Sequence, residues 1–197
     1  APGLVPSKNL VAVKAPVFSM SKLADVDTFL GPEMKSTGEV MGIDHTFEAA
    51  LGKALMAAGL TLKRGEVVLV SIADRDKAEA TPLLRQLADS GALIYATEGT
   101  AAMMKAMGLP VALVPKKLGE GHPNVLDIIN DGTVNAVVNT VSGSASILRD
   151  GFQIRRAAAE HRIPCFTSID TARSVVESLV EPVTYDVRPT SVYLTGP

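Results

Sequence analysis

The chain has 197 residues, of which 47% are hydrophobic and 20% are charged, and its formal net charge is −2. This composition excludes a disordered tail and a fibrous repeat, and so small a net charge does not attract nucleic acid or an anionic membrane. The single cysteine, Cys165, excludes an internal disulfide and a cysteine-rich zinc site. No run approaches the ~18 apolar residues of a membrane span, and the first residues lack a signal-peptide pattern. We therefore expect a soluble cytoplasmic protein.

Residues 1–60 contain few apolar elements separated by long polar stretches. Apolar runs at residues 10–17 and 38–43 predict two strands, and residues 46–58 predict a helix. Two strands and one helix seldom bury enough surface to fold alone, so we interpret this segment as part of something larger. A small independent α+β module is the alternative.

A polar joint at residues 61–65 precedes a regular alternation of short apolar runs and amphipathic stretches. We place a domain boundary there. Buried strands are predicted at residues 67–72, 92–96, 111–114, 134–139 and 164–167. Helices are predicted at residues 77–90, 100–107, 123–130, 146–162 and 169–179, and Gly91, Gly108 and Gly132 are placed to close three of them.

This alternation predicts an α/β fold: a five-stranded, mostly parallel sheet with helices on both faces, joined by right-handed crossovers. Because only 4% of the residues are aromatic, aliphatic side chains must fill the core. In such sheets ligands bind outside the carboxyl ends of the strands.

The residues that follow the predicted strands are cations, hydroxyls and small residues. They include Lys77, Thr97, Thr100, Lys116 and Asn139, with Gly119 to Gly121 and Ser142 to Ser144 beside them. Backbone amides at a helix N-terminus, hydroxyl donors and lysines together favour a phosphate site. Neither a G-x-G-x-x-G fingerprint nor a P-loop is present, so a phosphomonoester fits better than a dinucleotide or ATP. Each residue also has a plainer interpretation as a helix cap, a turn residue or a solvated charge.

Candidate catalytic residues are poorly arranged. His45, His122 and His161 share no metal-ligand spacing, and Cys165 lies in a predicted strand without a neighbouring histidine, so we interpret it as a buried structural cysteine. Asp74 and Asp76 follow the first strand of the sheet, where acids more often cap the next helix than act as a base. We therefore predict no catalytic residue and no metal site.

Residues 66–180 resemble the methylglyoxal synthase-like domain that ends the large subunit of carbamoyl-phosphate synthetases. Residues 1–60 resemble the end of the second ATP-grasp half of that subunit, and the most specific stretch is GPEMKSTGEVMG at residues 31–42. Residues 181–197, a C-terminal tail, have no clear counterpart. The order and spacing of the two regions agree with that family.

This resemblance implies an allosteric region that binds a phosphorylated effector, most commonly UMP, with IMP, UTP and phosphoribosyl pyrophosphate as further candidates. It implies that Lys77, Thr97, Thr100, Lys116 and Asn139 contact the effector. Val141 replaces a threonine of the family pattern and removes a hydroxyl.

The resemblance also implies that the ornithine response of some members is weak or lost here. Ala15 replaces an acidic residue, Cys165 replaces an aromatic one, and Thr167 remains. A buried ammonium group of a ligand needs the counter-charge that Ala15 no longer provides.

For the parent enzyme, the resemblance implies a ligase that uses ATP with Mg or Mn, and K, in the pyrimidine and arginine pathways. The implied partners are the rest of the large subunit, the glutaminase small subunit and further copies of the chain, with no nucleic acid and no membrane. The fragment itself is expected to hold no cofactor and to have no catalytic activity alone.

Two other functions are alternatives to effector binding. A methylglyoxal synthase, a lyase acting on dihydroxyacetone phosphate, has a similar phosphate cradle but needs a carboxylate after a Gly-Gly pair. This chain has Glu120 before Gly121-His122 instead, and the histidine of the later His-Asp-Pro-Asp loop in methylglyoxal synthases has no counterpart here, since only Asp150 of that loop is matched. A base displaced by one residue is poorly positioned to abstract a proton. The other alternative is an oligomerisation module, which exposed apolar helix residues would support.

Overall fold

The structure is a computed structural model, in which the chain forms two compact units. The N-terminal unit combines residues 1–18, 36–60 and 182–197, and the α/β unit combines residues 19–35 and 61–181. The change of unit at residues 60–61 falls at the start of the polar joint. The structure describes residues 3, 9–19, 27–28, 32, 34–116, 121–141, 145–180 and 187–195.

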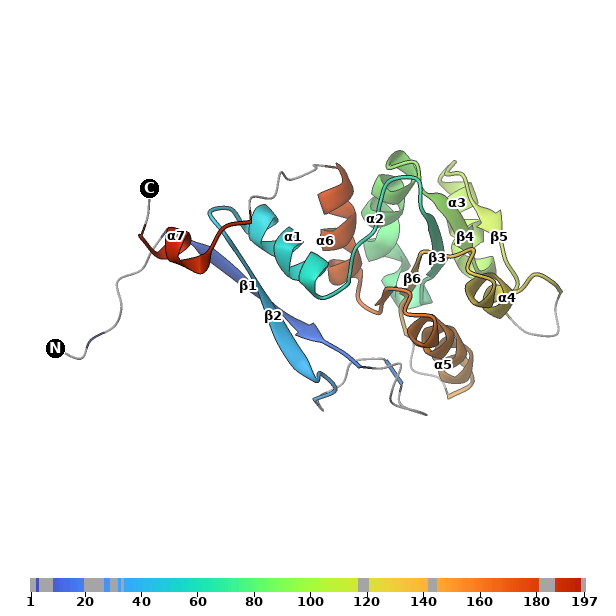
Figure 1. Ribbon diagram of the computed structural model, residues 1–197. Coiled ribbons are helices and arrows are strands. Elements are labelled where there is room, and N and C mark those ends of the chain that lie inside the picture. The colour runs from blue at the N-terminus through green and yellow to red at the C-terminus, as the bar shows by residue number, and fades with distance from the viewer. Residues whose placement is uncertain are drawn as a thin grey trace. The chain divides into compact units, whose positions relative to one another are not determined.

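The N-terminal unit contains an antiparallel hairpin of β1 (Val11–Val17) and β2 (Gly38–Asp44), followed by α1 (Phe47–Ala57) (Figure 1). These are the two strands and the helix expected from the apolar runs. A side chain at Gly42 would place its Cβ 2.6 Å from the backbone nitrogen of Ala54, so glycine lets α1 pack directly on β2. The Thr46 hydroxyl caps α1 by accepting a hydrogen bond from the Ala49 amide at 3.3 Å.

The C-terminal residues 187–195 belong to the N-terminal unit and include α7 (Thr190–Thr195). Lys53 of α1 holds them, because its ammonium group donates to the Tyr193 hydroxyl at 2.8 Å and to the Ile43 carbonyl at 3.2 Å, and forms an ion pair with Asp44 at 2.7 Å. These residues were expected to be a tail without a counterpart, and their place against α1 and β2 was not anticipated.

The α/β unit contains a five-stranded sheet whose described strand pairs are all parallel. The strands are β3 (Val67–Ser71), β4 (Leu93–Ala96), β5 (Ala112–Leu113), β6 (Ala136–Asn139) and β7 (Cys165–Phe166), in the order β5-β4-β3-β6-β7. All five predicted strands are confirmed, although β5 and β7 at the edges have only two residues each. The central strand β3 is buried on both faces.

Five α-helices connect and follow these strands (Figure 1). They are α2 (Lys77–Asp89), α3 (Glu98–Ala106), α4 (Val125–Asn130), α5 (Ala145–Glu160) and α6 (Ile169–Val180), and a short 3₁₀ helix, η2 (Asp74–Asp76), precedes α2. Right-handed crossovers in this strand order put α2 and α3 on one face and α4 and α5 on the other. The helix α6 packs against α2. The predicted α/β fold with helices on both faces is therefore confirmed.

Aliphatic side chains fill the core, as the low aromatic content requires. Leu69 of β3 and Val137 of β6 pack with Ile129 of α4 and with Ile154 and Ala158 of α5 in one cluster. Three glycines with positive φ follow helices, as expected: Gly91 after α2, Gly108 after α3 and Gly132 after α4. None of the described helices combines the length and the apolar character that crossing a bilayer requires.

Candidate phosphate-binding site

Polar side chains line the carboxyl edge of the sheet at its centre. Ser71 ends β3 and Thr97 follows β4, and the Thr97 hydroxyl donates a hydrogen bond to the Ser71 oxygen at 3.2 Å. Asn139, the last residue of β6, is paired in register with Ser71. All three side chains are buried. The parallel strands therefore bring Thr97 and Asn139 to the same edge, on either side of Ser71, as the strand-end argument predicted.

The N-terminus of α3 meets a lysine at this edge. The amides of Glu98, Gly99 and Thr100 begin the helix and have no acceptor within it. A Cβ on Gly99 would lie 3.0 Å from the ammonium nitrogen of Lys77, so the missing side chain leaves room for that charge. Unpaired amides and a lysine at one helix N-terminus are the groups that bind a phosphate.

Lys77 is already engaged by one carboxylate. Its ammonium group forms an ion pair with Asp74 at 2.6 Å, and this hydrogen bond lowers the pKa of Asp74. The general expectation that acids in this loop cap the next helix is wrong here. Asp76 occupies the N-cap position of α2 without a capping hydrogen bond from its side chain, which instead accepts from the Arg75 guanidinium at 3.3 Å.

Two threonine hydroxyls hold the turn between β3 and η2. The Thr100 oxygen accepts a hydrogen bond from the Ile72 amide at 2.9 Å, and the Thr140 oxygen accepts one from the Ala73 amide at 2.8 Å. Both side chains are buried. Thr100 therefore shapes the site through the backbone of the β3 turn. Thr97 is in the N-cap position of α3 but makes no capping hydrogen bond.

Lys116 follows β5 at the edge of the same region. Its backbone amide donates to the Glu98 carboxylate at 3.2 Å, and its side chain is half-buried. His122 is exposed and hydrogen-bonds Asp127 of α4 at 2.7 Å. The Asn124 amide and His122 lower the pKa of Asp127. The expectations for Gly119, Glu120 and the stretch at residues 142–144, and for the side chain of Asp150, lie outside the described residues.

Asn139 has a partner that sequence reasoning missed. Its side-chain oxygen accepts a hydrogen bond from the Arg155 guanidinium of α5 at 2.9 Å, and Arg155 is completely buried. A signal was present, because Arg155 stands between the apolar Ile154 and Ala158, on the stripe that faces the sheet. A cation in such a stripe must find a buried partner.

The described residues offer no evident reactive group. Cys165 is half-buried, and burial raises the pKa of its thiol to about 12 against the opposing charge of Arg155, so no thiolate forms near neutral pH. Within the described ranges no three His, Cys, Asp or Glu side chains gather as metal ligands. The donors and the lysine at the sheet edge are suited to an anion, and none of the described residues there is an evident nucleophile.

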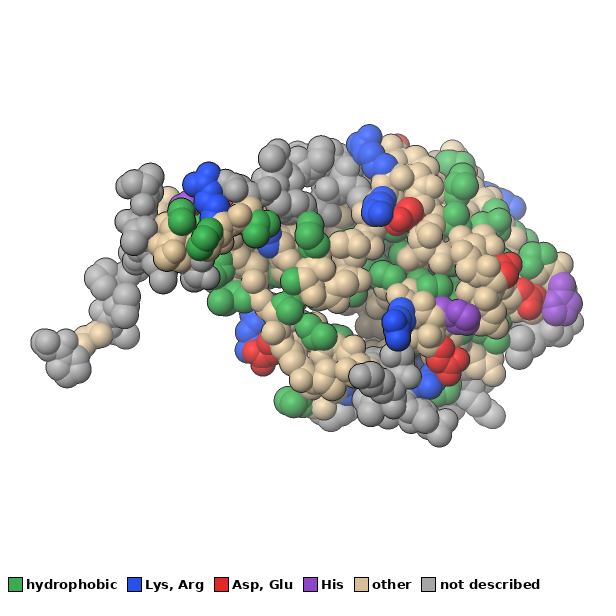
Figure 2. Space-filling model, in the orientation of Figure 1, with side chains coloured by type: hydrophobic (Ala, Val, Ile, Leu, Met, Phe, Trp, Pro, Cys, Tyr) green, Lys and Arg blue, Asp and Glu red, His purple; other side chains and the backbone are tan. Residues whose placement is uncertain are grey.

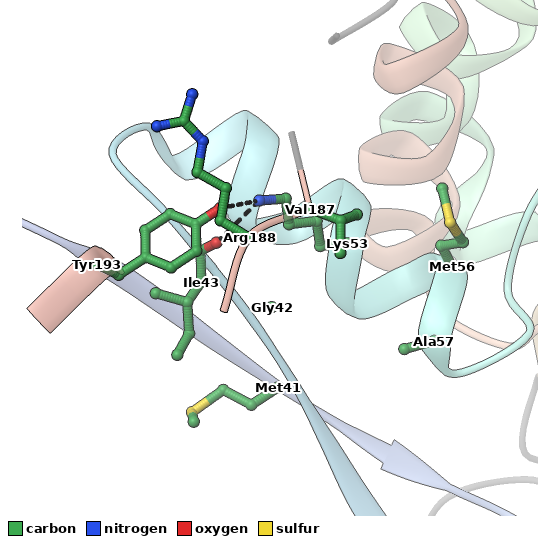
Figure 3. A pocket seen from close by; sticks show the side chains of 9 residues that line it. All are labelled: Met41, Gly42, Ile43, Lys53, Met56, Ala57, Val187, Arg188 and Tyr193. Carbon is green, nitrogen blue, oxygen red and sulfur yellow. Dashed lines mark hydrogen bonds between the residues drawn. The ribbon is translucent and has the colours of Figure 1, made fainter. Parts of the chain in front are cut away.

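A separate pocket of about 320 Å³ lies in the N-terminal unit, away from the predicted residues (Figure 3). Met41, Met56 and Val187 line it together with Lys53 and Tyr193. The contacts of Lys53 with Asp44, Ile43 and Tyr193 use its three donors, so this lysine does not offer a free charge to an anion. Hydrophobic side chains also lie exposed over the β1–β2 hairpin and α7 (Figure 2).

Comparison with known proteins adds the family. Residues 79–167, which run from the first turn of α2 to the residue after β7, match the family model described as MGS-like domain. The chain is 54% identical, over 194 residues and 98% of its length, to the carbamoyl phosphate synthase large chain of Thermomicrobium roseum. It spans 18% of the length of that relative. The α/β unit therefore carries an MGS-like domain, and the chain belongs to the carbamoyl phosphate synthase large-chain family.

Proposed function

We propose that the α/β unit binds a phosphorylated, nucleotide-type effector, with UMP as the first candidate, and thereby regulates carbamoyl phosphate synthesis by a larger enzyme. The relationship to carbamoyl phosphate synthase large chains supports an allosteric regulatory domain. The phosphate group of the effector would bind the amides at the N-terminus of α3, Lys77 and Thr97. Lys116, Thr100 and Asn139 would complete the contacts along the sheet edge.

One observation supports this proposal most directly: the Lys77 ammonium lies 3.0 Å from the Cβ position that Gly99 leaves empty. A side chain at position 99 would press on the lysine ammonium at the helix N-terminus, so glycine allows its close approach. Asp74 neutralises Lys77 in the structure. An incoming phosphate would replace that carboxylate at Lys77, and Asp74, which is 94% exposed, would then be solvated by water.

Residue 141, next to Thr140, bears on which effector the site would prefer. Val141 is buried, and its carbonyl accepts a hydrogen bond from Arg75 at 2.8 Å. A threonine side chain there would add a hydroxyl donor, which this chain lacks. We therefore propose a ligand whose recognition depends on its phosphate more than on the contact at residue 141. Because Ala15 and Cys165 replace the acidic and aromatic residues of the family pattern, we also propose a weak or absent response to ornithine.

The remaining proposals concern the parent protein. Residues 1–60 would be the end of an ATP-grasp half. The exposed Met41, Phe47 and Met56 of its hairpin and helix agree with a segment that continues into further structure. Partners would then be the rest of a cytoplasmic large subunit, which would bind ATP with Mg or Mn, and K, and a glutaminase subunit.

A thermal-shift screen of the full chain with UMP, IMP, UTP, phosphoribosyl pyrophosphate and ornithine tests the assignment. A ligand that binds the folded state alone raises the melting temperature. We expect a rise with at least one phosphorylated compound and none with ornithine. No shift with any phosphorylated compound would refute the regulatory assignment. Light scattering with and without UMP tests the further proposal that the chain self-associates.

A further inference from the structure

Arg155 is the largest fully buried side chain among the described residues. Its guanidinium makes two hydrogen bonds to the carboxylate of Asp27, one of them from Nε to Oδ1 at 2.7 Å, and the two side chains form an ion pair. Its Nη1 donates to the Asn139 oxygen at 2.9 Å. A buried guanidinium without partners would be strongly unfavourable. As long as Arg155 stays buried, it therefore needs its contacts with Asp27 and Asn139.

The contact with Arg155 decides which way the Asn139 amide faces. A guanidinium only donates hydrogen bonds, so the atom of Asn139 that meets it must be the carbonyl oxygen. The amino group of Asn139 then points away from Arg155. It makes no hydrogen bond within the described part of the chain. Asn139 therefore turns its N–H donors, and not its carbonyl oxygen, away from Arg155 and toward a ligand.

Gly151 provides the space for this arrangement. It lies one turn before Arg155 in α5, and a Cβ there would be 2.7 Å from Nη1 of Arg155 and 3.4 Å from the Asn139 oxygen. Because both atoms are buried and the guanidinium is fixed by Asp27, an added methyl group would push Nη1 and the Asn139 oxygen apart. A glycine in the interior of a helix otherwise costs stability relative to alanine.

Asp27 connects this cluster to another part of the chain. It lies in the segment between β1, which ends at Val17, and β2, which begins at Gly38, and this segment contributes to the α/β unit. The pair Asp27–Arg155 therefore links the sheet edge at Asn139 to the covalent connection between the two strands of the hairpin.

We propose that Arg155 is a positioning residue: it holds Asn139 as a hydrogen-bond donor to the effector and couples effector binding to the segment around Asp27. The inference rests on the proposed function. It adds that Asn139 donates, rather than accepts, the hydrogen bond to the effector, and that the Arg155–Asp27 ion pair couples effector binding to the segment around Asp27. Because coupling between two sites is reciprocal, loss of the Asp27 contact must weaken effector binding by the factor by which the effector strengthens that contact.

The test uses the full chain and UMP, with calorimetry for affinity and hydrogen exchange for the segment. Asp27→Asn removes the charge of the partner, and Gly151→Ala displaces Nη1 without changing the chemistry of the Arg155, Asp27 and Asn139 side chains. Gln153→Ala, at an exposed position of α5, is the matched control. We expect Asp27→Asn and Gly151→Ala to weaken UMP binding about tenfold, within the usual range of coupling, and the control to leave it unchanged.

In the unmodified chain, UMP should also slow amide exchange at residues 27 and 28, and Gly151→Ala should reduce that protection. A purely structural role of Arg155 would lower thermal stability in the variants without changing the effect of UMP on this segment. If the unmodified chain binds UMP but both variants bind it equally well, the positioning role is refuted while the effector assignment stands. If the unmodified chain binds none of UMP, IMP, UTP, phosphoribosyl pyrophosphate and inorganic phosphate, both proposals fail.

Discussion

Substitutions of Lys77 and Asp74 should change the affinity for the effector in opposite directions. Lys77→Met removes a charge-assisted hydrogen bond to the phosphate, a contribution of about 1.5 to 3 kcal/mol for bonds to charged groups. At about 1.4 kcal/mol per factor of ten, affinity should fall by roughly 10- to 150-fold. The lysine side chain is only 26% exposed, so solvent does not replace the lost contact fully.

Asp74→Asn should have the reverse effect. This carboxylate competes with the phosphate for Lys77 and is 94% exposed, so its removal leaves little unsatisfied in the fold. We expect affinity to rise by about two- to fivefold, because exposed ion pairs are weak. Calorimetric titration with UMP at 0.15 M salt measures both changes.

Lys105→Met is the matched control for these titrations. Lys105 is exposed in the last turn of α3, so the substitution removes the same charge from the opposite end of the same helix. It should leave affinity nearly unchanged. If Lys77→Met binds as tightly as the unmodified chain, or if Lys105→Met weakens binding equally, the phosphate does not lie at the N-terminus of α3.

Three further outcomes are expected. Thr100→Val leaves the buried Ile72 amide without its acceptor and should lower the free energy of unfolding by about 1 to 3 kcal/mol in urea denaturation, whereas Thr100→Ser should cost less. Cys165, with its pKa raised to about 12, should react with iodoacetamide at pH 8 far more slowly in the folded chain than in denaturant, and equal rates would contradict its burial. Hydrogen bonding to Lys53 lowers the pKa of Asp44. Burial by itself would lower the pKa of Lys53, but the hydrogen bonds of Lys53 to Asp44 and Tyr193 outweigh burial, so the pKa of Lys53 is raised. The stabilisation from Asp44 should therefore be lost as the pH falls below 3.8, and that from Lys53 as the pH rises above 10.5; urea denaturation at pH 3, 7 and 11 should show neither loss in Lys53→Met.

The order of elements could be predicted from the sequence because each depends on a local pattern. A short aliphatic run such as VVLVS, at Val67–Ser71, is typical of a central parallel strand that is buried on both faces. A glycine such as Gly91 can adopt the positive φ at which many helices end. The gathering of Thr97 and Asn139 at one edge followed from the same reasoning, since parallel strands share a carboxyl end.

The sequence by itself therefore determined the α/β fold and the edge of the sheet where polar residues collect. Only the tertiary structure decided what each side chain does there. Thr100 and Thr140 bond to backbone amides of the β3 turn, Lys77 lies beside the empty position at Gly99, and Arg155 joins Asn139 to Asp27, which is 128 residues away in the chain. These contacts depend on distances between segments remote in sequence, and helix and strand periodicity carries no information about such distances.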